Sequence, residues 1–136
     1  MSDCKCSCSC GSGESSCATN EAVKAVYPCS GASNVGKMSY DLAIALHQKN
    51  KYKMSCTAGV GADICGFTDA AKSEDTANLL IDGCPVSCVK HMFDNKGITN
   101  YDHIVITEMG IKKDGNFDFE PEVIDNLLNQ INEIGL

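Results

Sequence analysis

The ten cysteines are the residues of this chain with the most distinctive chemistry, and five of them lie within the first seventeen residues. The others are Cys29, Cys56, Cys65, Cys84 and Cys88. Thiolates bind soft metal ions, attack electrophiles and exchange with disulfides. A reducing compartment keeps such thiols free, so their number favours metal binding or thiol chemistry over a disulfide framework. Each cysteine taken singly also suits a small apolar place in a core.

Four of these cysteines, Cys29, Cys56, Cys84 and Cys88, lie at or just after the carboxyl ends of predicted strands. In an open parallel sheet these ends share the edge at which ligands bind, so we expect the thiols to converge there. Four clustered thiolates need a cation, and Zn²⁺ accepts four sulfur ligands in a tetrahedron. The pattern predicts a zinc site, although Cys84 and Cys88 could also form one buried helix face. Cys65 is interpreted as a core residue, with a reserve thiol as the alternative.

The elements that position these thiols follow from the apolar pattern of the chain. Strands are predicted at residues 22–27, 52–56, 78–82 and 102–108, and helices at 34–49, 63–71, 85–95 and from 121 onward. Strands alternating with helices predict an α/β fold. With right-handed crossovers it becomes a three-layer sandwich, in which a four-stranded parallel sheet of order 2-1-3-4 carries helices on both faces, as in Rossmann-like and flavodoxin-like folds.

Three ordered segments of the chain resemble the DGC-domain family. They are YPCSGASNVG at 27–36, CTAGVGAD at 56–63 and IDGCPVSC at 81–88. The family takes its name from an Asp-Gly-Cys tripeptide, matched here by Asp82, Gly83 and Cys84. The likeness covers about residues 22–136 and implies a zinc-binding domain, without naming a reaction. The chelators that it implies are Cys29, Cys56, Cys84 and Cys88.

The segment GASNVGK at residues 31–37 has the glycine and lysine spacing of a nucleotide phosphate loop. The next position, where a hydroxyl normally binds Mg²⁺, holds Met38. We therefore interpret the segment as a helix-capping turn, with Ser33 or Asn34 as the cap. Lys37 would then be a surface cation, or a cation near the site that offsets thiolate charge.

Other polar residues near the predicted site have two interpretations each. Asp82 either orients a ligand or caps the following helix, and capping is favoured. Glu108 could act as an acid or base at the end of the last strand, or it could be a solvated strand end. His91 is expected to pack near the site rather than bind metal, and His47 and His103 are expected to play no part in it.

The first twenty residues consist almost wholly of cysteine, serine, glycine and polar residues. This composition predicts a flexible tail at 1–20, followed by a folded domain at 21–136. The alternating Cys4, Cys6, Cys8 and Cys10 indicate that the tail binds or delivers soft metal, or docks on the core site. A tail without function is the alternative.

Charge and hydropathy exclude several partners. The formal net charge is −7 and the lysines are scattered, so neither nucleic acid nor an anionic membrane is expected as a partner. No run approaches the roughly 20 apolar residues of a membrane span, and the amino terminus lacks the apolar stretch of a signal peptide, so we expect a cytoplasmic protein.

Two function classes remain after these exclusions. The first is a zinc-binding protein, with a role in metal handling or in displaying a surface. The second is a thiol-based redox or sulfur-transfer enzyme, in which Cys29 or Cys84 is the nucleophile and the other the resolving thiol. The same thiolates could instead hold an iron–sulfur cluster. The sequence leaves the native metal, any reaction, the protein partner and the oligomeric state open.

Overall fold

A four-stranded, all-parallel sheet forms the centre of the computed structural model, which describes residues 22–136. The strands are β1 (Val23–Pro28), β2 (Lys53–Met54), β3 (Thr76–Asp82) and β4 (Tyr101–Val105). They lie in the order β2-β1-β3-β4. β1 pairs with β3 along its whole length, from Val23 opposite Thr76 to Pro28 opposite Ile81. The predicted fold class and strand order are thus confirmed.

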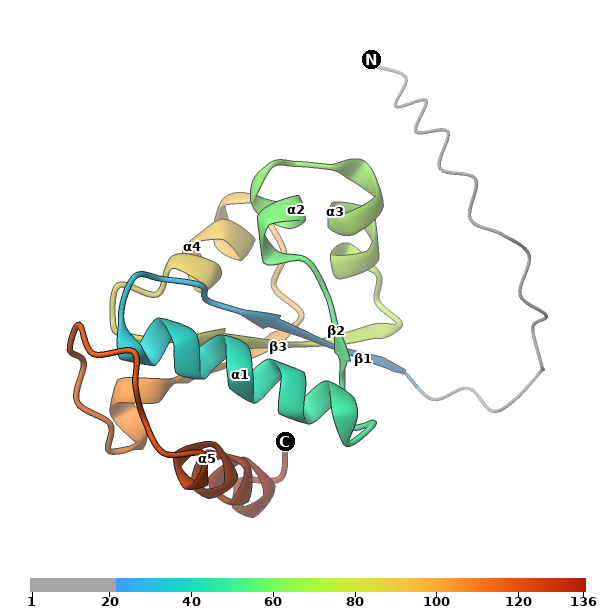
Figure 1. Cartoon of the computed structure of the whole chain (residues 1–136). Coiled ribbons are helices and arrows are strands. Elements are labelled where there is room, and N and C mark those ends of the chain that lie inside the picture. Colours follow the sequence, from blue (N-terminus) through green and yellow to red (C-terminus); the bar gives the residue numbers. More distant parts are fainter. Residues whose placement is uncertain (1–21) are drawn as a thin grey trace.

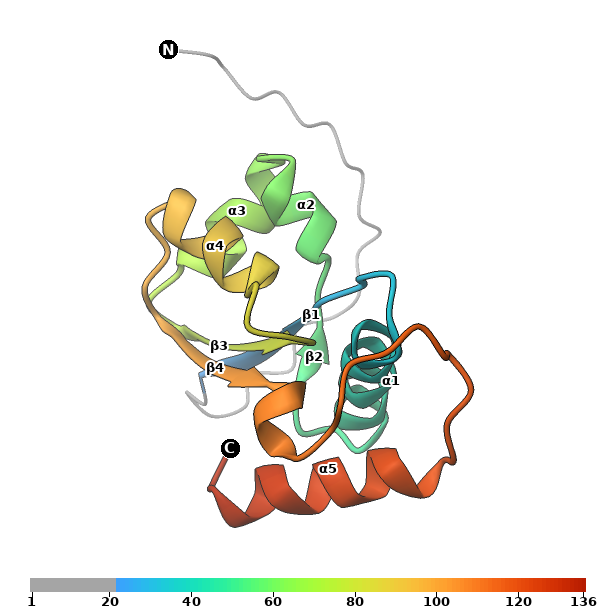
Figure 2. The same cartoon turned by 90° about the vertical axis from the view of Figure 1, so that its left-hand side faces the viewer.

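Helices cover both faces of this sheet (Figures 1 and 2). They are α1 (Asn34–Gln48), α2 (Thr57–Gly61), α3 (Cys65–Lys72), α4 (Cys88–Asn95) and α5 (Glu122–Glu133), with a 3₁₀ turn η1 (Ile106–Met109) after β4. α1 and α5 pack on one face, and α2, α3 and α4 on the other. The loops that follow β1 and β3 leave the sheet at one edge, on the left of Figure 1.

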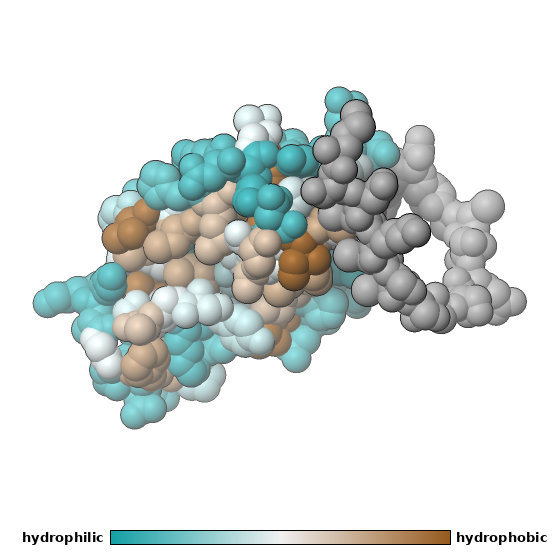
Figure 3. Space-filling view, turned by 90° about the horizontal axis from the view of Figure 1, so that it is seen from above, coloured by the Kyte–Doolittle hydropathy of each residue, from teal (hydrophilic) through white to brown (hydrophobic). Residues whose placement is uncertain are grey.

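The core divides into two clusters because successive strand side chains point to opposite faces. Val26, Leu79 and Ile81 face α1 and α5. Tyr27 and Leu80 belong to the cluster under α2, α3 and α4, where the ring of Tyr27 meets that of Phe93 edge to face at 4.9 Å between centroids. Figure 3 looks onto this second face, where hydrophobic residues run along the middle between hydrophilic margins.

The chain between β2 and β3 departs from the predicted elements. β2 is only two residues long, and a short helix, α2, occupies the glycine-rich segment between the second predicted strand and the second predicted helix. Asp63 does not cap the next helix; its φ of 59° places it in a left-handed turn between α2 and α3. The prediction of a helix over 63–71 therefore started too early and missed α2.

The boundaries of the last elements also differ from the prediction. Pro85 lies in a turn, and α4 begins at Cys88, after Ser87 in the left-handed region at φ 53°. β4 ends at Val105, so the predicted strand was three residues too long. The last helix, α5, ends at Glu133, and Ile134 just after it is 61% exposed.

Two further predictions concern the N-terminal tail and membrane-spanning helices. The predicted tail, with Cys4 to Cys10 and Cys17, lies outside the described residues. Between Ala22 and Leu136, the helices are too short or too polar to cross a bilayer.

Candidate thiol site at the carboxyl edge of the sheet

Hydrogen bonds between strand ends bring Cys29 and Cys56 to one edge of the sheet. The backbone N–H of Cys29 donates to the carbonyl oxygen of Ile81 at 2.7 Å, which fixes the end of β1 against β3. The hydroxyl of Thr57 donates to the carbonyl oxygen of Pro28 at 2.9 Å, which fixes the start of α2 against the end of β1. The neighbours of both cysteines are therefore bonded to each other, as convergence of the strand ends requires.

Asp82 attaches α4 to the end of β3. Its carboxylate, 1% exposed, accepts from the backbone N–H groups of Val89 at 2.9 Å and Lys90 at 3.1 Å. These are free donors of the first turn of α4, which a capping side chain normally satisfies. Ser87 makes no side-chain cap bond, so Asp82 supplies the cap from the neighbouring strand. The favoured interpretation of Asp82 as a cap is confirmed, and the cap fixes Cys88 relative to β3.

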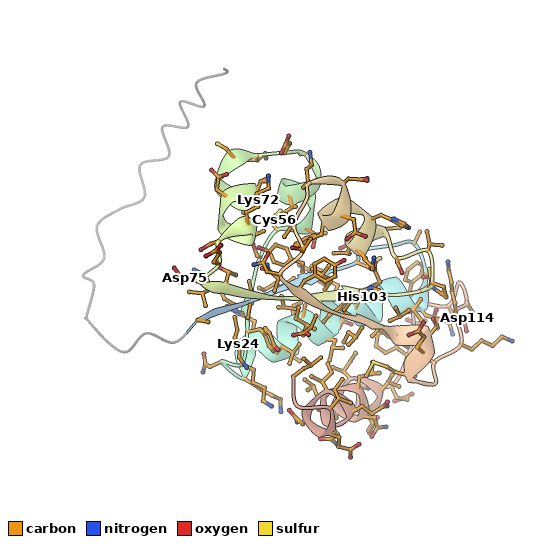
Figure 4. All side chains as sticks on the ribbon, turned by 180° about the vertical axis from the view of Figure 1, so that it is seen from behind. Lys24, Cys56, Lys72, Asp75, His103 and Asp114 are labelled. Atoms are coloured by element: carbon orange, nitrogen blue, oxygen red, sulfur yellow. The ribbon has the colours of Figure 1, made fainter. Side chains whose placement is uncertain are left out.

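His103 takes part in this arrangement, contrary to our expectation. His103, labelled in Figure 4, lies on β4 opposite Leu80 of β3. Its Nε2 is 2.9 Å from a carboxylate oxygen of Asp82. The β3–β4 register brings the histidine side chain to the buried carboxylate. β3, β4 and α4 are thus joined through Asp82.

Three of the four predicted ligands receive a hydrogen bond from another residue. The sulfur of Cys29 accepts from the N–H of Gly31 at 3.3 Å, and that of Cys56 from the N–H of Gly59 at 3.3 Å. Gly31 lies two residues beyond Cys29, and Gly59 belongs to the first turn of α2, for which Cys56 is the N-cap. The two contacts orient the sulfurs of Cys29 and Cys56 relative to the backbone that follows them.

The sulfur of Cys84 has a cation beside it. Lys113 Nζ donates to Cys84 Sγ at 3.4 Å from the loop between η1 and α5. Asn34 holds that loop: its Nδ2 donates to the carbonyl oxygen of Lys112 at 2.8 Å, and its Oδ1 accepts from the N–H of Asp114 at 2.8 Å (Asp114 is labelled in Figure 4). Because Asn34 is buried, the loop is anchored to the start of α1.

Cys88, the first residue of α4, is exposed and differs from the other three. Desolvation raises the pKa of its thiol, and the negative charges of Cys29, Asp82 and Cys84 raise it further, against a smaller lowering by its own backbone N–H. Three acidic groups therefore lie within electrostatic range of Cys88. A positive ion among them would remove this penalty on the thiolate.

The lysine of the GASNVGK segment contacts a carboxylate and an aromatic ring. Lys37 Nζ pairs with Asp41 at 2.7 Å and lies 4.5 Å above the ring centroid of Phe119. Its side chain is 47% exposed, which fits the interpretation of Lys37 as a surface cation, and the lysine that contacts a predicted site thiol is Lys113. The sequence around Lys113 does not indicate its contact with Cys84, because the position of Lys113 depends on the hydrogen bonds that Asn34 makes with the loop.

The glycines of the same segment allow close backbone packing at the start of α1. Ser33 caps α1, accepting from the N–H of Gly36 at 3.3 Å, as expected for one of the two proposed caps. A Cβ on Gly36 would lie 2.1 Å from the carbonyl oxygen of Gly31, so that carbonyl lies against the first turn of α1. Gly83 also approaches this turn, since a Cβ there would lie 3.0 Å from Val35 and Gly36 backbone atoms. Gly36 and Gly83 therefore allow neighbouring backbone segments to approach the start of α1 closely.

A hollow of about 280 Å³ opens between the ends of β1, α2 and α4. Its lining includes Cys29 and Cys88, and Thr57, the neighbour of Cys56. The remaining lining residues are Pro28, Ser30, Gly31, Ala58, Val89 and Met92. All nine lining residues are uncharged. A larger hollow of about 810 Å³ lies at the other end of β1 and contains none of the cysteines.

The remaining candidates lie in other parts of the described fold. Glu108 lies exposed in η1 rather than at a strand end, and His91 is exposed on α4. Cys65 begins α3. Within residues 22–136, no three His, Cys, Asp or Glu side chains are close enough together to hold one metal ion. The zinc prediction for Cys29, Cys56, Cys84 and Cys88 therefore remains a prediction.

Comparison with known proteins gives two matches. The model of the DGC domain matches residues 25–131. The chain is also 35% identical over 109 residues to the Anaerobic and virulence modulator AnvM of Pseudomonas aeruginosa, an alignment that covers 80% of this chain and 82% of the relative. No solved structure matches the chain.

Proposed function

This chain belongs to the DGC domain family, and from that premise we propose that it is a metal-binding protein that holds a zinc ion through cysteine thiolates. The ligands proposed are Cys29, Cys56, Cys84 and Cys88. Bound zinc would supply a redox-inactive crosslink between the strand ends. We further propose that the protein acts in the cytoplasm, where its thiols stay reduced.

The observation that supports this proposal best is the gathering of acidic groups around Cys88. Cys29, Cys84 and Asp82 all disfavour the thiolate of Cys88, so the site concentrates negative charge where a cation is needed. The exposed thiols of Cys56 and Cys88 would turn about χ1 toward the other two on binding. A zinc ion with four thiolates carries a net charge of −2, of which Lys113 would offset one unit.

We propose a regulatory or metal-handling role for this site. The relative from Pseudomonas aeruginosa is named for the modulation of anaerobic behaviour and virulence, which is a regulatory description. A closed site of four thiolates leaves no position for a substrate, so it suits a sensor or carrier better than a catalyst.

Metal analysis of purified protein tests the proposal. The full-length chain would be prepared without added metal, in a background in which Cys4, Cys6, Cys8, Cys10 and Cys17 are replaced by serine. We expect about one equivalent of zinc, and a large loss of it in each of the four Cys-to-Ser variants of the site. Cys65→Ser is the matched control and should retain the metal. Less than about half an equivalent, unaffected by Cys84→Ser, would reject the proposal.

A thiol-based redox or sulfur-transfer enzyme is the second candidate, and the contact of Lys113 with Cys84 favours it. A cation beside a sulfur favours the nucleophilic thiolate. Selective alkylation of Cys84 near neutral pH in metal-free protein would support this candidate. An iron–sulfur cluster on the same thiolates would give visible absorbance in protein prepared anaerobically, which a zinc protein lacks.

A further inference from the structure

We propose that Cys29 and Cys88 form a redox-active dithiol pair, which reduces a small uncharged disulfide bound in the hollow beside them and closes to a Cys29–Cys88 disulfide. This inference goes beyond the proposed function, because it concerns the metal-free protein and involves no metal ion. It also goes beyond the second candidate above, which names no substrate and in which Cys84 is the reactive thiol.

Cys29 and the start of α4 lie on the same face of the sheet. Cys29 is two residues beyond Tyr27 and packs against the same hydrophobic cluster. On the neighbouring strand, the carboxylate of Asp82 accepts from the N–H of Val89 at 2.9 Å, which holds the first turn of α4 at this strand end. Cys88, directly before Val89, is the first residue of that turn. A strand end and a helix start therefore bring the two cysteines to one place.

The hollow of about 280 Å³ is lined by both of these cysteines. The other cysteines of residues 22–136, which are Cys56, Cys65 and Cys84, are absent from its lining. Burial raises the pKa of the Cys88 thiol, and among the neighbouring charges that raise it further, that of Cys29 has the largest effect. Two thiols that line one hollow and interact electrostatically are suited to react in turn with one bound molecule.

The surroundings of Cys84 make it a poorer partner for Cys29. Cys84 packs against the hydrophobic cluster beneath α1 and α5, whereas Cys29 packs against the cluster beneath α2, α3 and α4. Its sulfur also accepts from Lys113 Nζ at 3.4 Å, in the loop before α5. Cys88 is exposed at the hollow, so a rotation about χ1 is open to its side chain. Cys88 is therefore the cysteine that we pair with Cys29.

The chemistry of the hollow selects the class of substrate. A dithiol gives up two electrons when it closes, and a disulfide accepts two electrons by thiol exchange. None of the nine lining residues carries a charge, so a carboxylate or phosphate would lose its hydration without meeting a cation. The net charge of −7 also disfavours an anionic substrate. Because the hollow is at the small end of ligand pockets, the substrate is a small disulfide with an uncharged body.

The reaction balances in two exchange steps. The thiolate of one cysteine attacks a sulfur of the substrate, a mixed disulfide forms, and half of the substrate leaves as a thiolate that takes a proton. The thiolate of the other cysteine then attacks the protein sulfur of the mixed disulfide, and the second half leaves in the same way. The substrate disulfide is reduced to two thiols, and the protein dithiol is oxidised to one disulfide.

Reaction of metal-free protein with hydroxyethyl disulfide tests the inference. The probe would be added at one equivalent to the full-length chain, with serine at the five tail cysteines. We expect about two molecules of β-mercaptoethanol to be released for each probe consumed. Peptide mapping by mass spectrometry should find Cys29 linked to Cys88 as the main product. In concentrated urea this preference should be lost, because the fold no longer holds the two cysteines together.

Single variants assign the two thiols. Cys29→Ser and Cys88→Ser should each stop at a mixed disulfide and release only about one thiol for each probe consumed. Cys84→Ser and Cys65→Ser are matched controls and should still close the Cys29–Cys88 linkage. Oxidised glutathione, which is larger and carries a net negative charge, should form the linkage at least about tenfold more slowly than hydroxyethyl disulfide.

The outcomes separate this inference from the proposed function. A parent protein that stops at mixed disulfides, or that links Cys29 mainly to another cysteine, overturns the dithiol pair. Equal rates with the two probes overturn the class of substrate. Neither result bears on zinc, which metal analysis tests separately. Circular dichroism shows whether each variant is folded, and the linkage found in the parent protein decides the inference even where a variant is unfolded.

Discussion

Replacing Asp82 should destabilise the protein more than replacing any exposed carboxylate on the same side of the sheet. Asp82→Ala removes the acceptor of three donors at once: the N–H groups of Val89 and Lys90, and His103. All three would be left beside a small buried space without an acceptor. Asp82→Asn keeps the shape of the side chain but turns an amide group toward at least one of these donors.

The size of the effect follows from the burial of the carboxylate. Hydrogen bonds to a charged group contribute about 1.5–3 kcal/mol each, and they are not additive. The loss of a helix cap costs about 1 kcal/mol, and the loss of two or three hydrogen bonds to one carboxylate about 3–5 kcal/mol together. We therefore expect Asp82→Ala to cost about 3–5 kcal/mol and Asp82→Asn about half of that. Total stabilities are about 5–15 kcal/mol, so Asp82→Ala would lose a large share.

Urea denaturation of metal-free protein measures this change. With a slope of about 2 kcal/mol/M, the midpoint for Asp82→Ala should fall by about 2 M. Asp94→Ala is the matched control, because Asp94 also pairs with Lys90 but its side chain is 39% exposed. Its midpoint should hardly change. Equal shifts for the two alanine variants would refute the role of Asp82 as a buried cap.

Three further predictions follow from other contacts. Lys113→Met should raise the Kd for zinc about tenfold because the hydrogen bond from Lys113 to the sulfur of Cys84 is lost. Lys112→Met should leave the Kd unchanged. Competition with a chromophoric chelator measures both dissociation constants. In metal-free protein the alkylation of Cys88, followed by mass spectrometry, should rise with pH around a midpoint above the ordinary thiol pKa of 9.0, because burial and neighbouring negative charge disfavour the thiolate. Asp82→Asn should lower that midpoint, and an unchanged midpoint would contradict the electrostatic cause. Gly36→Ala should lower Tm by several degrees because its Cβ would meet the Gly31 carbonyl, whereas Gly66→Ala in the open part of α3 should raise it slightly; equal shifts would count against the close packing.

The sheet and its order were predictable because they depend on local periodicity and on the handedness of crossovers. Apolar runs such as NLLID mark a strand buried on both faces, and right-handed connections leave few strand orders. Ser33 was predictable as a helix cap because a serine directly before a segment of helical apolar periodicity is a common start of a helix. The short helix α2 was not, since its TAGVG sequence has weak helix propensity and the contact of Thr57 with Pro28 helps to hold it.

The contacts around the thiols depend on information that a single sequence does not contain. His103 reaches Asp82 only because of the β3–β4 register, and a two-residue slip would keep the same apolar pattern while moving the histidine away. Lys113 reaches Cys84 only because Asn34 binds a loop 78 residues further along the chain. Residue type and strand ends therefore predicted where the cysteines lie, but not what surrounds each sulfur.

The close approach of Gly83 to α1 gives the Asp-Gly-Cys tripeptide a geometric meaning. The aspartate reaches forward to one helix, the glycine leaves room for another, and the cysteine turns toward the open edge. The tripeptide can make these contacts only at the end of a central strand, where one helix begins on each face of the sheet. The tripeptide alone is therefore a weak marker of this arrangement. The arrangement also includes the apolar residues Leu79, Leu80 and Ile81 before the tripeptide and a second cysteine four positions after the first.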